Sequence, residues 1–311
     1  MVNIRDVTIR QLRAVAAIAR NGKITLAASE LCLTPPAVTE QLKLLEDRLG
    51  LRLFQRTRAG LMPTDAGLQL VETAARMEAL LADAGDQLRA IKGLAGGRVT
   101  IGVVGTAKYF APRLVASFGE RHPQIAIQLN IGNRAETISA LRNYDIDVAI
   151  MGRPPEGIPA KEAVFGSHPH VMIAPPNHPL AGETGPIERH RLAGEKLLLR
   201  EVGSGTRLLF ERLFSGVVSA ESAIRIEISS NETIKQAVMA GLGLAFISAH
   251  TIELEVQTGR LAILNIMDLP AIREWYLVHR EDKELPPAAT AFWQYVLKEG
   301  RNFLPRIPGI E

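Results

Sequence analysis

The sequence has little of what disulfide-bonded, zinc-binding or membrane-spanning proteins require. It contains one cysteine, Cys32, in 311 residues, which excludes an internal disulfide and any zinc site built from several cysteines. We expect Cys32 to pack on the apolar side of a helix. No apolar run reaches about 18 residues, and no basic N-terminal segment leads into an apolar stretch, so neither membrane insertion nor export is expected. The expected compartment is the cytoplasm.

Sequence motifs of common enzymes are also missing. The chain has no G-x-S-x-G, H-E-x-x-H or G-x-x-x-x-G-K-S/T, and no G-x-G-x-x-G after a strand. Gly203-Ser204-Gly205 alone does not indicate a nucleophile. His168 and His170 lie near prolines without carboxylate or thiolate partners, which is more typical of loop residues than of metal ligands. We therefore expect no enzymatic activity, no metal site and no cofactor.

The charge is nearly balanced overall but unevenly distributed. Lys and Arg number 36 against 33 Asp and Glu, which gives a net charge of +3. The sequence pI is about 9.1, and basic residues are dense before Arg58. This distribution favours local contacts to phosphate rather than a uniformly cationic surface. The length and the 47% of hydrophobic residues predict two or three domains with well-filled cores.

The N-terminal pattern predicts three short helices. Thr8 and Gln11 form a T-x-x-Q capping box before the first helix, which ends at residues 21–22, and the second begins near residue 25. Thr34 caps the third helix, with Pro35 at its first position. Along the third helix an apolar stripe faces the core, made of Val38, Leu42, Leu45 and Leu49. The opposite face, with Pro35, Thr39, Glu40 and Lys43, is then free to contact DNA.

A hairpin with a basic tip is expected after the third helix. Apolar residues at 51–54 are followed by Arg56, Arg58, Gly60 and Pro63, a pattern that suits a β-hairpin wing. Arginines at such a tip can contact phosphate or the minor groove, while the third helix enters the major groove. A solvated basic loop is the commoner interpretation of an isolated R-x-R, but the position directly after a helix-turn-helix favours DNA contact.

Residues 64–93 contain no proline and predict one long helix of roughly 40 Å. Its apolar stripe follows a heptad pattern and consists of Leu70, Ala74, Met77, Leu81, Ala84, Leu88 and Ile91. A second copy of the helix would cover this stripe and would place two recognition helices on an inverted-repeat operator in double-stranded DNA. The alternative is packing against the C-terminal part of the same chain.

Beyond the glycines at 93–97, strands and helices alternate. Strands are expected at 99–104, 125–131, 147–151, 171–174, 196–199, 224–228, 244–247 and 274–279, and helices from residues 106, 134, 206, 231 and 287. The last strand and helix would return to the first set. This pattern predicts an α/β domain of two lobes joined by two strands.

Four junctions between a strand and a helix carry residues suited to an anion, because helix N-termini present free amides and the positive end of the helix dipole. Each junction alone is better explained as a helix cap, but their convergence on one cleft would make an effector site. Lys108, Arg134 and Arg207 could donate to carboxylate or phosphate oxygens. The candidate effector-binding residues are Thr106, Ala107, Lys108, Asn133, Arg134, Gly203, Ser204, Thr206, Arg207, Asn231 and Glu232.

Residues 27–56 and the P-T-D-A-G of residues 63–67 resemble the helix-turn-helix and wing of LysR-type transcriptional regulators, and the resemblance covers the family's whole length. It implies a winged helix-turn-helix DNA-binding domain at 1–64, a dimerisation linker helix at 65–93, a hinge at 94–97 and a two-lobed, periplasmic-binding-protein-like effector domain at 98–311. The DNA-contacting residues implied are Thr34, Pro35, Pro36, Thr39 and Gln41, with Arg56 and Arg58 on the backbone or in the minor groove. A homodimer that assembles to a homotetramer is also implied.

Glu40 departs from the basic or neutral polar residue that many relatives carry. A carboxylate there would repel phosphate but could accept a hydrogen bond from cytosine N4. Both roles stay open.

Three further segments resemble the CbbR-like branch of the family, which regulates carbon-dioxide-fixation genes. They are VVGTAKYFAPRL, REVGSGTRLLFERLF and SSNETIKQAVMAGLGLAFIS. This branch implies a phosphorylated or redox metabolite of the Calvin cycle, such as a sugar phosphate, as the effector. RNA polymerase is a further candidate partner. The alternatives are a LysR-type regulator of another metabolic operon and, from a different class, the solute-binding protein of a transporter, which would need an export signal.

Overall fold

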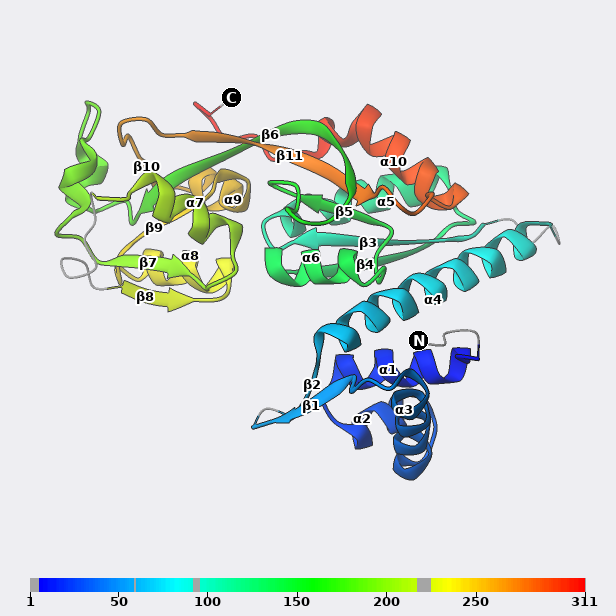
Figure 1. Ribbon diagram of the computed structural model, residues 1–311. Helices are drawn as coiled ribbons and strands as arrows, with labels where there is room; N and C mark the ends of the chain where they lie inside the picture. Colours follow the sequence, from blue (N-terminus) through cyan, green and yellow to red (C-terminus); the bar gives the residue numbers. More distant parts are fainter. Residues whose placement is uncertain (1–5, 59, 92–95, 217–224, 311) are drawn as a thin grey trace. The chain divides into compact units, whose positions relative to one another are not determined.

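The computed structural model describes residues 6–58, 60–91, 96–216 and 225–310 (Figure 1). The chain forms two compact units, residues 1–88 and 89–311. Each unit has its own hydrophobic core. No helix in the described ranges is long and apolar enough to cross a lipid bilayer.

Three helices and a hairpin build the first unit. Helices α1 (Ile9–Asn21), α2 (Ile24–Glu30) and α3 (Pro35–Leu49) precede the antiparallel strands β1 (Phe54–Thr57) and β2 (Gly60–Pro63). The capping box of Thr8 and Gln11 and the Thr34 cap are both present, as the sequence predicts. The three helices share one core, whose members include Val15, Ile18, Val38 and Leu45.

The expected packing of Cys32 is wrong. Helix α2 ends at Glu30, and Cys32 follows in the left-handed region, with φ 54°. The Leu33 amide donates back to the Ala28 carbonyl over 2.9 Å, which closes this turn before α3. Because the chain reverses here, the Cys32 side chain is exposed.

The expected long helix is present as α4 (Asp65–Ile91). Its first half packs on the first unit, where Ala74 is fully buried with Leu12 and Ala16 and is flanked by Met77. Further along, Leu80, Leu81 and Leu88 are exposed. The apolar stripe is therefore covered at one end of the helix and bare at the other.

One sheet runs through both lobes of the second unit. Its strands are β3 (Arg98–Val104), β4 (Ala126–Gly132), β5 (Val148–Met151), β6 (Ala160–Ala174), β7 (Leu197–Arg200), β8 (Arg225–Ile228), β9 (Leu244–Ser248), β10 (Ala262–Leu264) and β11 (Ala271–Arg280). The strand order is β4-β3-β5-β11-β6-β9-β7-β8, and β10 pairs with β6. Strands β6 and β11 extend between the lobes, so the prediction of two lobes joined by two strands is confirmed (Figure 1).

Helices cover the sheet in both lobes. The first lobe, with β3, β4 and β5, carries α5 (Ala111–Arg121), α6 (Arg134–Arg142) and α10 (Pro287–Glu299). The second lobe, with β7, β8 and β9, carries α7 (Gly205–Leu213), α8 (Asn231–Met239) and α9 (Glu253–Gln257). Short 3-10 turns lie at Ala107–Tyr109, Pro179–Gly182, Arg189–Leu192, Ala249–Thr251 and Gly300–Phe303. The first lobe encloses one core, around Phe110, Phe118 and Trp275, and the second lobe has a separate core on each side of its sheet.

Several expected boundaries differ from the structure. The helix expected from residue 106 begins at Ala111, after a 3-10 turn, and the strand expected at 171–174 begins at Ala160. His168 and His170 therefore lie inside β6, paired with Arg273 and Ala271 of β11, and their assignment to a loop is wrong. The sequence pattern did not identify this part of β6, because Pro169 lies between the two histidines and the strands that pair with the segment are distant in sequence. Residues 94 and 95 of the expected hinge, and residue 224, lie outside the described residues.

Candidate DNA-binding surface and ligand cleft

Helix α3 presents a polar face to solvent. Val38, Leu45 and Leu49 are buried on one side of the helix, which fixes its orientation in the unit. The face opposite to them is exposed and carries Thr34, Pro35, Pro36, Thr39, Glu40 and Lys43, with Gln41 half-buried. This face is the one that the sequence predicts to contact DNA.

A buried carboxylate connects α3 to the hairpin. Glu46 is 7% exposed and accepts hydrogen bonds from the backbone amides of Leu53, over 2.7 Å, and Phe54, over 3.4 Å. Arg52 pairs with the second carboxylate oxygen at 2.9 Å. The sequence pattern predicted only apolar residues on this side of α3. Helical periodicity does not show that a polar side chain such as Glu46 accepts hydrogen bonds from the adjacent hairpin.

The hairpin also lies against the turn between α1 and α2. The Leu61 amide donates to the Gly22 carbonyl over 2.8 Å. Gly60 has φ +125°, and a Cβ there would lie 2.5 Å from the same carbonyl oxygen, so glycine is required for this approach. Arg56 and Arg58, near the hairpin tip, are exposed. The hairpin is thus anchored beside its tip, through Gly60 and Leu61, while the side chains of Arg56 and Arg58 are exposed to solvent.

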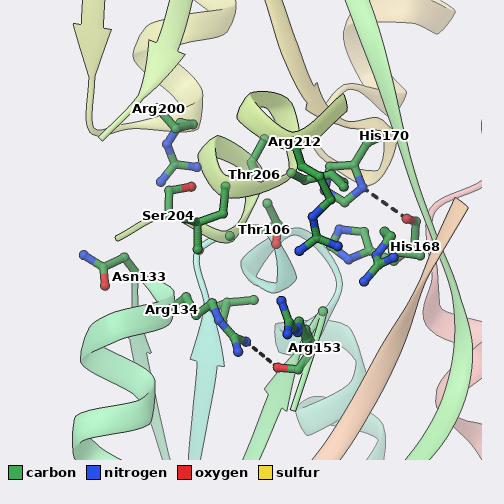
Figure 2. A pocket seen from close by; sticks show the side chains of 17 residues that line it. Thr106, Asn133, Arg134, Arg153, His168, His170, Arg200, Ser204, Thr206 and Arg212 are labelled. Atoms are coloured by element: carbon green, nitrogen blue, oxygen red, sulfur yellow. Dashed lines mark hydrogen bonds between the residues drawn. The ribbon is translucent and has the colours of Figure 1, made fainter. Parts of the chain in front are cut away.

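The second unit contains a cleft between its lobes (Figure 2). It holds about 720 Å³ of space, including the part open to solvent. The residues that line it come from both lobes and from the connecting strands: Val104, Gly105, Thr106, Asn133, Arg134, Gly152, Arg153, His168, His170, Arg200, Ser204, Gly205, Thr206, Leu208, Leu209, Arg212 and Arg273.

The lining is strongly cationic. Five arginines line the cleft, and no aspartate or glutamate is among these lining residues. Arg134 donates to the backbone carbonyls of Arg153 and Pro154, which fixes its side chain beside the cavity. Burial, and the neighbouring charge of Arg153, lower the pKa of Arg134 from its ordinary value. A ligand that supplies negative charge would relieve this repulsion between arginines.

The N-terminus of α7 opens into the same cleft. Ser204 is the N-cap residue, but its side chain does not cap a helix amide. Ser204 and Thr206 are buried, as is Thr106 in the other lobe. First-turn amides of a helix lack intrahelical partners, so this end of α7 offers donors and the positive end of the helix dipole to an anion.

A cluster of neutral histidines lies between β6, β9 and β11. His168 stacks on Trp275, with ring centroids 3.8 Å apart, and its Nε2 lies 2.9 Å from the Ser248 hydroxyl. Burial lowers the pKa of His168 well below its ordinary value and lowers that of His170 to about 3. Burial likewise lowers the pKa of His250 to about 4. These rings are therefore uncharged near neutral pH.

Five residues that the sequence predicts as effector-binding line the cleft. They are Thr106, Asn133, Arg134, Ser204 and Thr206. The remaining six, Ala107, Lys108, Gly203, Arg207, Asn231 and Glu232, are not among the lining residues. Three of the four junctions therefore contribute residues to the lining, and the junction with Asn231 and Glu232 contributes none.

The charged residues among those six are engaged in protein contacts. Arg207 pairs with Glu211 at 2.6 Å and with Glu227 at 3.2 Å. Lys108 pairs with Glu232 across the lobes. Their charges are already neutralised by carboxylates, which leaves them less suited to hold a ligand than arginines without such partners.

Asn231 joins the lobes instead of capping its helix. Its side-chain oxygen accepts from Arg200, and its amide donates to the Gly105 carbonyl over 3.3 Å. The N-cap of α8 is Ser230, whose hydroxyl accepts from the Thr233 amide. Arg200 is held further by its neighbour Glu201.

Six cleft residues with ring or guanidinium groups escaped the sequence prediction: Arg153, His168, His170, Arg200, Arg212 and Arg273. Leu208 and Arg212 share a face of α7 at helical spacing, a signal that could have identified Arg212. His168 and Arg273 become neighbours only through the pairing of β6 with β11, which the sequence does not reveal. No group of three His, Cys, Asp or Glu side chains in the described ranges could hold a metal ion.

Both units of the chain match known protein families. Residues 9–68 match the family described as "Bacterial regulatory helix-turn-helix protein, lysR family", and residues 92–301 match "LysR substrate binding domain". The chain is 52% identical over 302 residues to "HTH-type transcriptional regulator CbbR" of Sinorhizobium medicae, which covers 97% of this chain and 96% of that protein. It is 43% identical to the "RuBisCO operon transcriptional regulator" of Allochromatium vinosum, over 97% of this chain and 99% of the relative.

A solved structure resembles the second unit. The regulatory domain of Synechocystis PCC6803 CcmR, solved "in complex with 2-PG", is 36% identical and covers 66% of this chain and 98% of its own, with a TM-score of 0.63. Both units thus match one family, with the helix-turn-helix domain before the substrate-binding domain in the chain. The chain belongs to the LysR family of DNA-binding transcriptional regulators.

Proposed function

We propose that this regulator controls carbon-fixation genes and that a small anionic metabolite, bound between the two lobes of its second unit, sets its activity. The observation that carries the ligand proposal is a cleft whose described lining residues include five arginines and no carboxylate. Such a lining disfavours binding of a cation. It favours binding of a ligand with several anionic oxygens, because guanidinium groups form charge-assisted hydrogen bonds to phosphate and carboxylate.

The names of the relatives support the choice of target genes. Two of them are called CbbR and the RuBisCO operon regulator, and the latter name states the operon. The CcmR regulatory domain, at 36% identity, was solved with 2-PG. We therefore propose 2-PG and the phosphorylated or redox metabolites of the Calvin cycle, sugar phosphates among them, as the first candidates for the effector.

The donors for the ligand come from both lobes. Arg134 and Thr106 lie in the first lobe, and Ser204, Thr206 and the N-terminus of α7 lie in the second. A ligand that contacts both lobes stabilises the arrangement in which those donors meet, and it shifts the population of conformations by its differential affinity. Only a ligand that binds the two arrangements unequally can regulate the protein.

On the DNA side, the proposed contacts divide into two kinds. Residues of α3 would approach base edges and phosphates in the major groove, and the hairpin arginines would contact the backbone or the minor groove. The proposed DNA-binding residues are Thr34, Pro35, Pro36, Thr39, Gln41, Lys43, Arg56 and Arg58.

We propose further that the regulator acts as a homodimer, or as a dimer of dimers, on an inverted repeat. The exposed leucines of α4 would pair between two copies and would present two α3 helices to one operator. Its site of action would be the cytoplasm, where bacterial DNA is transcribed, and RNA polymerase is the proposed partner in transcription.

The proposal is tested by titrating 2-PG, a panel of sugar phosphates and a non-phosphorylated sugar into the full chain by calorimetry. At least one phosphorylated compound should bind, and Arg134→Ala should weaken it about tenfold or more, since a hydrogen bond to a charged group is lost. Arg191, an exposed arginine of the second lobe that pairs with Glu183, gives the matched control Arg191→Ala. Failure of every anion to bind the full chain would overturn the effector proposal.

The target genes are tested separately, by footprinting the full chain on the promoter of a carbon-fixation operon and on promoters of other metabolic operons from the same genome. Protection confined to the carbon-fixation promoter supports the proposal. Protection of a different metabolic promoter alone would favour the alternative, a LysR-type regulator of another operon.

A further inference from the structure

One buried nitrogen in the cleft has no hydrogen-bond partner among the residues that the structure describes. His168 is 3% exposed, and its Nδ1 is the buried side-chain nitrogen or oxygen that lacks a hydrogen bond among the described residues. The other ring nitrogen lies 2.9 Å from the Ser248 hydroxyl. An unpaired buried polar atom is costly, so its presence in a cleft-lining side chain suggests a partner from outside the chain.

Gly152 keeps the space beside this nitrogen open. A Cβ at Gly152 would lie 2.8 Å from His168 Nδ1 and 3.2 Å from Cε1. Gly152 and His168 both line the cleft. A side chain at position 152 would therefore fill the space through which a ligand atom reaches Nδ1.

Arg273 lies on the same face of the sheet as His168. The two residues are directly opposite each other in the pairing of β11 with β6, and opposite side chains of an antiparallel pair point to one side with their Cβ atoms about 5 Å apart. Arg212 approaches from α7. In Figure 2 its side chain extends into the cleft on the side of His168 and His170.

These two arginines differ from the others in the cleft. Arg134 donates to two backbone carbonyls, Arg153 pairs with Glu156, and Arg200 pairs with Glu201. Arg212 and Arg273 form no hydrogen bond or ion pair with any residue that the structure describes. Two uncommitted guanidinium groups and one uncommitted imidazole nitrogen thus line one cavity.

We propose that Arg212, Arg273 and His168 Nδ1 form a seat for an oxyanion, the His168 seat, which holds one acidic group of the effector. This inference rests on the proposed function, because it assigns an end of the same ligand. The seat takes a phosphate or a carboxylate, since both present several acceptor oxygens to forked guanidinium donors. The Ser204 and Thr206 end of the cleft would then receive the remainder of the molecule.

The imidazole can serve as a neutral donor in this seat. The Ser248 hydroxyl can donate to His168 Nε2, which leaves the proton on Nδ1. An anionic oxygen next to Nδ1 selects that tautomer. Because the ring donates without carrying a charge, it adds a directed hydrogen bond to the two positive charges of the arginines.

A pair of substitutions isolates this hydrogen bond. Asparagine places its amide nitrogen near the position of histidine Nδ1, whereas glutamine places its amide near Nε2. Both lose the ring that stacks on Trp275, so His168→Asn and His168→Gln share the packing loss. We expect His168→Gln to bind phosphorylated probes about tenfold more weakly than His168→Asn does.

A second pair leaves every donor in place. Gly152→Ala should reduce affinity by covering Nδ1, whereas Gly182→Ala, where the added Cβ would meet nothing within 4 Å, should not. Arg212→Ala and Arg273→Ala should each weaken binding about tenfold to a hundredfold, compared with no change in Arg191→Ala.

The experiment is calorimetry on the full chain with 2-PG, inorganic phosphate and malonate as probes, and circular dichroism confirms that each variant is folded. A loss with inorganic phosphate identifies a phosphate seat, and a loss with malonate alone identifies a carboxylate seat. If Arg134→Ala weakens 2-PG while the variants of His168, Gly152, Arg212 and Arg273 bind as the wild type does, the His168 seat is wrong and the proposed function stands. If the wild type binds neither these probes nor any sugar phosphate of the panel used to test the proposed function, both are overturned.

Discussion

Lys108 of the first lobe and Glu232 of the second form an ion pair, with 2.6 Å between Nζ and Oε2. Tyr109 donates to the other carboxylate oxygen over 2.5 Å. Desolvation alone would raise the pKa of Glu232, but the hydrogen bonds from Lys108 and Tyr109 outweigh it and lower the pKa to about 2. The lobes are therefore connected by charged contacts outside the cleft lining as well as by the two long strands.

Removal of this connection should loosen the lobes. In Glu232→Ala we expect amide hydrogen exchange at Gly105 and Thr106 to rise about twofold to fivefold, because a half-exposed ion pair contributes at most about 1 kcal/mol. Glu211→Ala, which breaks the pair with Arg207 inside the second lobe, is the control. Equal exchange in wild type and Glu232→Ala would show that the pair does not restrain the lobes.

Stability should fall as the pH drops below about 6.5. Burial lowers the pKa of His168, His170 and His250 in the folded chain, so the unfolded chain takes up protons that the folded chain does not. Each of these histidines should therefore reduce the free energy of unfolding by up to about 1.4 kcal/mol per pH unit between pH 6.5 and 5. Above pH 6.5 their contribution is constant.

Urea titrations at a series of pH values measure this slope. In His170→Gln the slope should decrease by about 1.4 kcal/mol per pH unit, because one of the three proton uptakes is removed. His190, whose side chain is 70% exposed, provides the control His190→Gln with the wild-type slope. A wild-type slope in His170→Gln would contradict the assignment.

The Glu46 carboxylate should stabilise the first unit. Glu46→Ala removes the acceptor for the Leu53 and Phe54 amides, which costs about 1–3 kcal/mol, or several degrees in the melting temperature of a unit of this size. The neighbouring exposed residue gives Asp47→Ala as control. Calorimetric scans of the full chain test the effect, and an unchanged first-unit transition in Glu46→Ala would refute it.

The hairpin arginines should contribute to DNA affinity without selecting sequence. Arg56→Ala is expected to weaken binding to all sequences and to reduce the slope of log affinity against log salt by about 1. Fluorescence anisotropy between about 50 and 200 mM salt measures this slope. Thr39→Ala should instead change the ranking of operator variants. A retained salt slope in Arg56→Ala would remove that side chain from the phosphate contacts.

Self-association should depend on the exposed leucines of α4. Leu81 and Leu88 are 47% and 61% exposed, and Leu81→Asp with Leu88→Asp would place two charges in the proposed dimer contact. Sedimentation should then show a smaller assembly than the wild type. Leu254→Asp is the control, because it makes the same change at an exposed leucine of α9, outside the proposed dimer contact. An unaltered assembly would locate the contact elsewhere.

Local sequence patterns predicted much of the secondary structure. The Thr8 and Thr34 caps, the buried stripe of α3 and the long helix α4 follow from residues within one or two turns of each other, so each was predictable from the sequence. Strand β6 was recognised only at its apolar end, because Pro169 and its flanking histidines lack the periodicity of a strand. Pairing with β11 and β9 stabilises that segment.

The same division applies to the cleft. Thr106, Asn133, Arg134, Ser204 and Thr206 lie at junctions between strands and helices, and a junction is a local feature that the sequence reveals. The sequence does not reveal which arginines at these junctions remain unpaired. Arg207 pairs with two carboxylates. Arg212, on the same helix, has no such partner among the described residues.

The sequence by itself therefore determined the helix-turn-helix, the long helix and the alternation of strands and helices in the two-lobed domain, since these depend on spacing, caps and turns within short segments. The family followed from the resemblance of residues 27–56 and 63–67 to LysR-type regulators. Only the tertiary structure decided which charged side chains pair with each other and which face the cleft. Lys108 and Glu232 are 124 residues apart, and His168 and Arg273 meet only across two paired strands. Electrostatic and hydrogen-bond partners act over a few ångströms, and only folding brings such distant residues within that distance.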